Sequence, residues 1–170
     1  MTPALSLITI LQTRSFADEN YALVESRLGV ALPRPTFGEN LTATGISHEQ
    51  VYIGDHFKVG EAVICVAQPT ERCRTVGRCA GMPKILKELH ELEVCGFYAR
   101  VVKPGWVAAG DRLLLCDRPQ PSWSIKRLHR LMFHGLADSR SRRRWRSSTS
   151  PLNGKGVPRP CAAASDAVSP

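Results

Sequence analysis

Several signatures that define common enzyme and binding classes are missing from this 170-residue sequence. It has no serine–histidine–acid arrangement, no glycine-rich loop that would cradle a phosphate, and no paired-carboxylate site. It also has no close Cys-x-x-Cys pair, and the spacings of Cys73, Cys79 and Cys95 do not match a zinc ribbon. These absences argue against the commonest hydrolases, against nucleotide-binding loops and against a structural zinc site.

Long apolar runs are absent as well. The run from Ala4 to Leu11 is far shorter than the roughly 20 residues that cross a bilayer, and it lacks a basic start and a small-residue cleavage site. We interpret it as a strand or a disordered leader and expect no membrane association. The six cysteines show no dense disulfide framework, which favours reduced thiols and a cytoplasmic location.

Positive charge is concentrated at the C-terminal end of the chain. From Ser139 onward, seven Lys or Arg residues face one acid, Asp166, so this segment carries +6 of the formal net charge of +8. It is also rich in Ser and Pro, a composition that cannot bury enough surface to offset chain entropy. We therefore predict one domain over residues 1–138 and a disordered basic tail over residues 139–170.

The tail leaves two interpretations open. The arginine cluster around Trp145 could bind nucleic acid through phosphate contacts and base stacking. A solvated tail without a partner explains the same composition equally well.

Three segments have the apolar spacing of helices. Residues 16–28 repeat apolar side chains at helical intervals before Gly29, a residue that often ends a helix. A second helix is predicted after Pro83, with Ile85 and Leu89 on its apolar face, and a third over residues 122–134.

The remaining predicted elements are strands. Residues 61–68 and 94–102 are mostly apolar and long enough to cross a small sheet, and residues 51–53 form a short strand-like run. The Gly54-Asp55 turn that follows this run has a counterpart at Gly110-Asp111. The sequence therefore predicts a β-rich domain with a few helices.

A loop cysteine is the candidate reactive group. Pro69 cannot donate to a strand ladder, so the strand should end there and place Cys73 in a loop. Arg72 and Arg74 on either side would favour its thiolate, the form that attacks electrophiles and binds soft metals. The alternative is an inert cysteine tucked under a loop.

An ordered set of motifs resembles a known family. The set consists of FGENL (Phe37 to Leu41), VYIGD, KVGEAVICVAQP, the cysteine four residues after Pro69, CGFYARVVKPGWVAAGDRLLL and PSWSIKRLHRLMFHG. Together these segments, best matched over residues 37–135, are similar to the MOSC domain, which is named for the C-terminal domain of molybdenum cofactor sulfurases.

The resemblance implies a mainly β, barrel-like domain that holds the molybdenum cofactor (molybdopterin). It assigns Cys73 as the metal ligand and catalytic residue. Asn40, in the FGENL segment, would contact the polar pterin with its donors and acceptor. Arg72 and Arg74 would neutralise the cofactor phosphate or the charge at the metal.

The stand-alone bacterial members that the chain resembles imply a reductase of N-hydroxylated compounds, such as hydroxylaminopurines and amidoximes. Such an oxidoreductase would act on a small-molecule substrate and draw electrons from a donor protein. Pyridoxal phosphate enters only by family association, through a separate domain of the sulfurases. Two other classes stay open: a non-catalytic MOSC remnant, and a basic-tailed nucleic-acid-binding protein.

Two departures from the family pattern bear on these expectations. Close relatives carry an arginine after Gln-Pro, whereas Thr70 stands here and Arg72 lies next to the cysteine. The family also has an N-terminal half-barrel with a His-Gly-Gly segment that this sequence lacks, so we expect an N-terminally truncated domain with part of its pocket wall missing.

Overall fold

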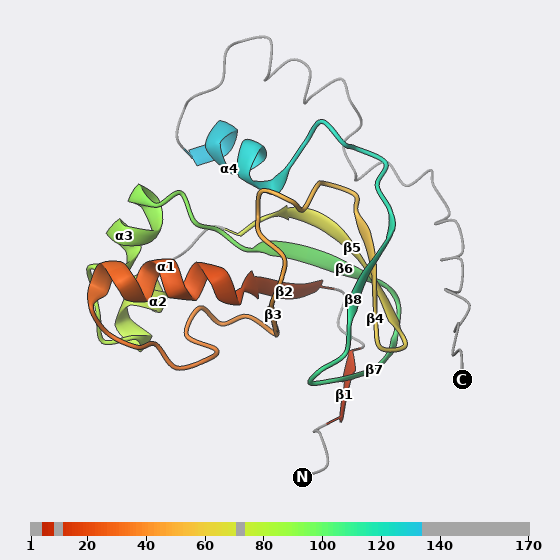
Figure 1. Cartoon of the computed structure of the whole chain (residues 1–170), viewed down its shortest axis with the longest axis horizontal. Coiled ribbons are helices and arrows are strands. Elements are labelled where there is room, and N and C mark those ends of the chain that lie inside the picture. Colours follow the sequence, from red (N-terminus) through yellow and green to blue (C-terminus); the bar gives the residue numbers. More distant parts are fainter. Residues whose placement is uncertain (1–4, 9–11, 71–73, 134–170) are drawn as a thin grey trace, which may run out of the picture.

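The computed structural model describes residues 5–8, 12–70 and 74–133. Its main element is a six-stranded sheet with the order β3-β2-β6-β5-β4-β8 (Figure 1). β2 and β3 are parallel, and the other neighbouring strands are antiparallel. A second sheet pairs β1 with β7. The strands are β1 Leu5–Ile8, β2 Gln12–Ala17, β3 Leu41–Ala43, β4 His56–Val59, β5 Ala62–Pro69, β6 Phe97–Lys103, β7 Gly105–Ala108 and β8 Leu113–Asp117.

β5 shows why this sequence forms a sheet with one buried face. Ala62, Ile64 and Val66 are fully buried, whereas Val63 and the residues that alternate with it are partly exposed. Because side chains alternate between the two faces of a strand, the first set points into the core. Register shifts between β5 and β6, and between β4 and β8, bend the sheet. The sheet consequently curls into half of a barrel.

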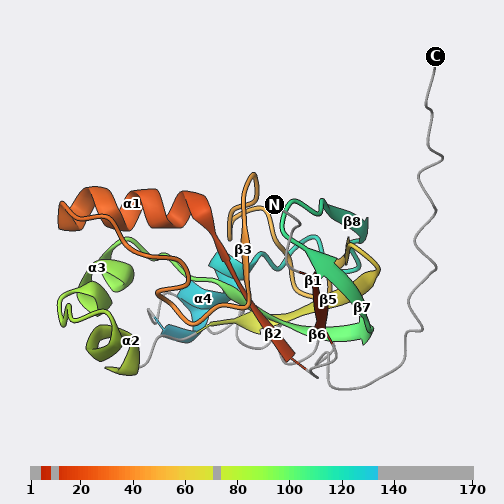
Figure 2. The same cartoon turned by 90° about the horizontal axis from the view of Figure 1, so that it is seen from below.

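Three helices pack together at one end of this sheet (Figure 2). They are α1 Asp18–Leu28, α2 Arg74–Cys79 and α3 Ile85–Glu91. The rings of Tyr21, Phe16 and Phe37 pack edge-on or tilted against one another in the core, with ring centroids 4.5–5.3 Å apart. On the surface, Arg27 of α1 bonds Glu88 and Glu91 of α3 at 3.0 Å each, which ties the two helices together.

The fourth helix, α4 Ile125–Phe133, packs against the concave face of the sheet. Its buried residues Ile125 and Leu128 join Trp123 in a core cluster with Ile64 and Val66 of β5. The Ile53 amide donates to the Trp123 carbonyl at 2.9 Å, which fixes the entry to the helix. The helix therefore fills one part of the half-barrel and leaves the rest of its concave face uncovered.

The structure confirms most of the predicted elements and corrects two. The helix predicted over residues 16–28 ends as expected at Gly29, whose φ is 68°, but begins at Asp18, because Phe16 and Ala17 pair with β3 instead. The strand predicted over residues 51–53 is wrong: Tyr52 forms only an isolated bridge with Ser124. The N-terminal apolar run does contain a strand, β1.

Among the described residues, no helix has both the length and the apolar character needed to cross a membrane. The predicted basic tail lies outside the described residues, as do Arg72 and Cys73.

Candidate functional site

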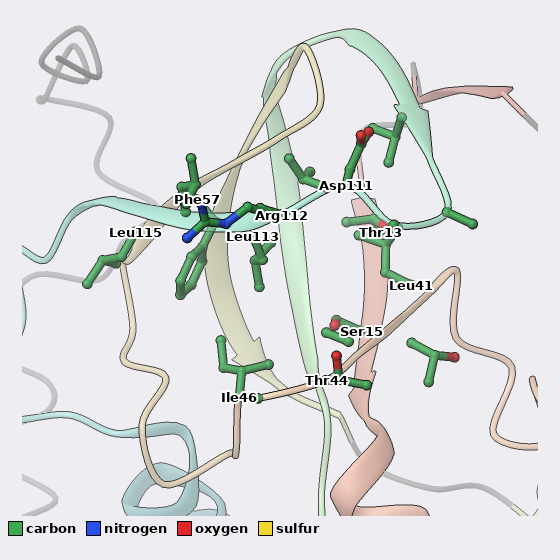
Figure 3. Close-up of a pocket in the computed structure, with 18 of the residues that line it drawn as sticks. Thr13, Ser15, Leu41, Thr44, Ile46, Phe57, Asp111, Arg112, Leu113 and Leu115 are labelled. Atoms are coloured by element: carbon green, nitrogen blue, oxygen red, sulfur yellow. The ribbon is translucent and has the colours of Figure 1, made fainter. Parts of the chain in front are cut away.

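A cavity of about 940 Å³ opens on the concave side of the half-barrel, between the two edge strands β3 and β8 (Figure 3). Its walls come from β2, from β3 with the loop after it, from β4, and from the β7–β8 turn with β8. Cavities of roughly 300–1,000 Å³ hold small molecules and cofactors. The curled sheet therefore builds a site of cofactor size at the place where its two edges approach each other.

The floor of the cavity is lined by apolar side chains on one side and by Thr and Ser side chains on the other. Phe57 and Val59 of β4 line it and are 3% and 5% exposed, and both belong to core clusters. Thr13 and Ser15 line it from β2, where alternation turns both side chains to the same face. Thr13 is 1% exposed, and its hydroxyl oxygen is buried without a hydrogen-bond partner among the described residues. A flat ligand with polar edges would suit both kinds of surface.

The FGENL segment forms part of the wall, and its glutamate holds it in place. The buried Glu39 accepts a hydrogen bond of 2.5 Å from the Tyr21 hydroxyl and one of 3.2 Å from the Thr42 hydroxyl. The Tyr21 oxygen in turn accepts the Thr36 amide at 2.8 Å. Burial, with the Glu39 hydrogen bond adding to it, raises the pKa of Tyr21, so this phenol stays a donor at all ordinary pH values.

Asn40 follows Glu39 and lines the cavity. Its backbone amide donates to the Arg14 carbonyl at 2.9 Å, and its side-chain oxygen accepts the Arg14 amide at 2.9 Å. We expected Asn40 to offer a ligand both donors and an acceptor. The structure commits the acceptor to β2, which leaves the side-chain NH₂ group for a ligand.

Two Gly-Asp turns with the same hydrogen bonds flank the cavity. Asp55 accepts the Tyr52 amide at 2.9 Å, and Asp111 accepts the Ala108 amide at 2.8 Å, in each case three residues back. The preceding glycines have φ values of 81° and 96°, which non-glycine residues rarely adopt. Within the described residues, only the aspartate of the first turn is paired with an arginine: Arg118 bonds both oxygens of the buried Asp55 at 2.9 Å.

The predicted site residues fall into two groups. Cys73 and Arg72 lie outside the described residues, and Arg74 begins α2 with a side chain that the structure does not describe. Thr70, which replaces the family's arginine, is buried and locked to the strand beside it: its amide donates to the Gly96 carbonyl at 2.9 Å, and its hydroxyl accepts the Gly96 amide at 3.0 Å. Of the predicted set, Asn40 alone is thus placed at the cavity.

Two cysteines in the described part of the chain can be compared with our expectation of reduced thiols. Cys65 and Cys95 are free, as expected. Cys65 is partly exposed on the convex face of β5, and burial raises the pKa of its thiol. Burial outweighs the nearby positive charge of Arg100, so this thiol lacks the lowered pKa that marks a reactive cysteine.

Sequence reasoning missed Thr13, Ser15 and Arg112, which all line the cavity. The alternation of Thr13, Ser15 and Ala17 on β2 was a usable signal of a strand with one polar stretch on its inner face. The helical spacing that follows extends back to Phe16 and obscures this signal. Arg112 follows the second Gly-Asp turn directly.

Comparison with known proteins decides the family. A family model described as "MOSC domain" matches residues 12–114, which is more than half of the chain. The chain belongs to the MOSC domain family. This confirms the resemblance carried by the FGENL, VYIGD and CGFYARVVKPGWVAAGDRLLL segments. The MOSC family is generally associated with the molybdenum cofactor.

Three relatives of this MOSC domain protein share about a third of the aligned residues. The uncharacterized protein YflK of Bacillus subtilis is 34% identical over 119 residues, which is 70% of this chain and 54% of YflK. A protein named Reductase from Gibberella moniliformis is 35% identical over 97 residues, or 56% of this chain and 17% of that protein. YiiM of Escherichia coli is 36% identical over 84 residues, or 49% of this chain and 38% of YiiM. The chain thus spans about half the length of YflK and less of the other two.

Two solved structures show the same fold. YiiM from Geobacillus stearothermophilus superposes with a TM-score of 0.80 at 23% identity, covering 88% of this chain and 79% of that one. YiiM from Escherichia coli superposes with a TM-score of 0.76 at 24% identity, covering 88% of this chain and 80% of that one. These matches confirm the predicted β-rich, barrel-like fold of the MOSC type.

Proposed function

We propose that this MOSC domain protein binds the molybdenum cofactor and, with it, reduces N-hydroxylated compounds. The main support for the proposal is that a chain of the MOSC family has a cofactor-sized cavity between β3 and β8. The relative named Reductase supports the reaction class. The substrate is a small molecule, and a donor protein supplies the electrons.

The described residues fit such a cofactor. A phosphorylated pterin presents ring donors and acceptors and a dianionic group, and the cavity is lined by hydroxyl-bearing side chains, the Asn40 NH₂ group and the Arg112 guanidinium. The apolar wall at Phe57 would pack against the flat ring. When bound, the cofactor supplies a two-electron reduction that removes the oxygen of an N–OH group.

The chain itself would bind and orient the cofactor and exclude water from it. In this proposal Cys73 provides the thiolate that holds the metal, and Arg72 and Arg74 neutralise negative charge around it. Asn40 orients the pterin, because its side-chain oxygen is fixed by Arg14 and its NH₂ group is thereby held in one direction. Pyridoxal phosphate stays a prediction from family association, and none of the described residues is assigned to it.

Asn40→Asp tests the orienting role without disturbing the fold, since an aspartate keeps the oxygen that accepts the Arg14 amide and loses the NH₂ donors. We expect the variant to have the same melting temperature as the wild type. With reduced viologen as the electron donor, it should reduce a hydroxylaminopurine or an amidoxime at least about tenfold more slowly. Wild-type protein that carries the cofactor and reduces neither substrate would refute the proposed reaction. Unchanged rates in Asn40→Asp would refute the role of Asn40.

A further inference from the structure

The convex face of the six-stranded sheet gathers positive charge. Residues that pair directly across two antiparallel strands point to the same face, and so do residues two apart on one strand. Arg100 of β6 pairs with Cys65 of β5, which lies on the convex face. By these two rules the strands place four basic side chains there, which we call the basic face: Arg14 of β2, Lys58 of β4, and Arg100 and Lys103 of β6. Asp117 of β8 is the one acid that the described strands add to this face.

Three residues of the basic face are available to a ligand. Arg14, Lys58 and Lys103 are exposed, and none of them forms an ion pair within the described part of the chain. Arg27 and Arg130, by contrast, are exposed arginines that bond acids of neighbouring segments. Like charges on one face repel each other, and a bound polyanion relieves that repulsion.

Aromatic side chains lie among these cations. Tyr98 of β6 is partly exposed and lies between Arg14, its partner across the strands, and Arg100, two positions along. Trp106 of β7 is 48% exposed, and it points away from the cavity because its neighbour Val107 lines the cavity. Cations that contact phosphates, together with rings on which bases stack, are the combination that binds single-stranded nucleic acid.

The C-terminal segment repeats this combination in its sequence. Residues 139–170 carry a formal charge of +6 and include Trp145 within a cluster of arginines. An acidic protein would need only the charge, whereas a nucleic acid uses both charge and rings. In a duplex the bases are already stacked inside the helix, so exposed rings favour a single strand, whose bases are free to stack on them.

We propose that the basic face binds single-stranded nucleic acid through its phosphates, and that Tyr98 and Trp106 stack on the bases. Contacts to phosphates carry no sequence information, so binding should show little sequence preference. The basic face lies on the opposite side of the sheet from the cavity. The inference is therefore independent of the cofactor and of the proposed reaction.

Fluorescence anisotropy of the full chain with labelled oligouridine and oligodeoxythymidine of about 12 nucleotides tests the proposal. The triple variant Arg14→Gln, Lys58→Gln, Lys103→Gln should bind at least about tenfold more weakly at low salt. The slope of log affinity against log salt should become shallower by about 2, because each phosphate contact to a single strand contributes about 0.7.

A second triple variant is the matched control, because it removes the same charge from exposed residues elsewhere. It combines Arg78→Gln, Lys84→Gln and Lys87→Gln, which lie in and beside the helices α2 and α3. Its affinity should stay within about twofold of the wild type. Equal weakening by the two triple variants would assign binding to overall charge and overturn the proposal, as would a wild type that binds neither oligonucleotide.

Ring variants separate a nucleic acid from an acidic protein. Trp106→Leu and Tyr98→Leu should each weaken binding at least about fivefold and leave the salt slope unchanged, because stacking involves no phosphate. Trp106 is the safer of the two for folding, since about half of its surface is exposed. Full affinity in both ring variants, with polyglutamate displacing the oligonucleotides at equal charge, would indicate an acidic protein partner and overturn the proposal. Tighter binding of one oligonucleotide, with the same effects of the variants, would support it and identify RNA or DNA.

Discussion

Asp55 should be the most stability-sensitive polar residue around the cavity. Its side chain is fully buried and holds three groups at once: the Tyr52 amide and two nitrogens of Arg118, each at 2.9 Å. Its hydrogen bond also raises the pKa of Arg118. Asp55→Asn removes the negative charge and turns an NH₂ group toward a donor, so Arg118 loses its partner and the turn loses part of its anchor.

The expected loss follows from burial. Removing one partner of a buried ion pair costs about 3–5 kcal/mol. Arg118 is 32% exposed in its side chain, so water screens part of the interaction, and we reduce the expected loss to roughly 2–3 kcal/mol. For a protein of this size, that loss lowers the melting temperature by roughly 4–12 °C.

Asp111→Asn is the matched control, because Asp111 makes the same hydrogen bond in the second Gly-Asp turn but is exposed and has no arginine partner in the structure described. An asparagine oxygen can replace the acceptor there, so the loss should stay below about 1 kcal/mol. Urea denaturation of the two variants gives the comparison. Losses of equal size would refute the argument that the buried pair, rather than the turn itself, carries the energy.

Two further predictions concern stability. Burial lowers the pKa of His48, whose two ring nitrogens have no hydrogen-bond partner in the part of the chain that the structure describes, and the charge of Lys126 acts in the same direction. As the pH falls, the unfolded chain therefore protonates His48 before the folded chain does, so stability should fall below about pH 6.5. In His48→Leu, the urea midpoint should depend less steeply on pH, and an unchanged dependence would contradict this explanation. Gly60→Ala should lower the free energy of unfolding, measured in urea, by roughly 2–4 kcal/mol, because φ is 54° and the new Cβ would lie 2.5 Å from the Trp106 carbonyl oxygen. Gly45 has a φ of 73° but open space around it, so Gly45→Ala should lower it by only about 1 kcal/mol. Similar losses for the two glycine variants would rule out the clash.

The sequence predicted those elements whose signal is local. Apolar spacing located α1, α3 and α4, and continuous apolar runs located β5 and β6. The repeated Gly-Asp turns form the same hydrogen bonds, as their matching sequences suggested. Such features depend on neighbouring residues, which a pattern can capture.

The missed features depend on contacts between distant segments. β2 has few apolar residues and becomes a strand because Thr13 and Ser15 pair with Ala99 and Phe97 of β6. The cavity arises only when the sheet curls and brings β3 toward β8. For the same reason no local pattern indicates that Arg112 and Thr13 line the same cavity, since 99 positions separate them along the chain.

In the proposed function, a thiolate at Cys73 holds molybdenum in this MOSC domain. Metal analysis of protein made in a cofactor-producing host tests it most directly, with Cys65→Ser as the matched control, because Cys65 is a free thiol on the convex face. We expect molybdenum near one atom per chain in wild type and Cys65→Ser, and little or none in Cys73→Ser. Equal molybdenum in Cys73→Ser and wild type, or none in wild type, would contradict it.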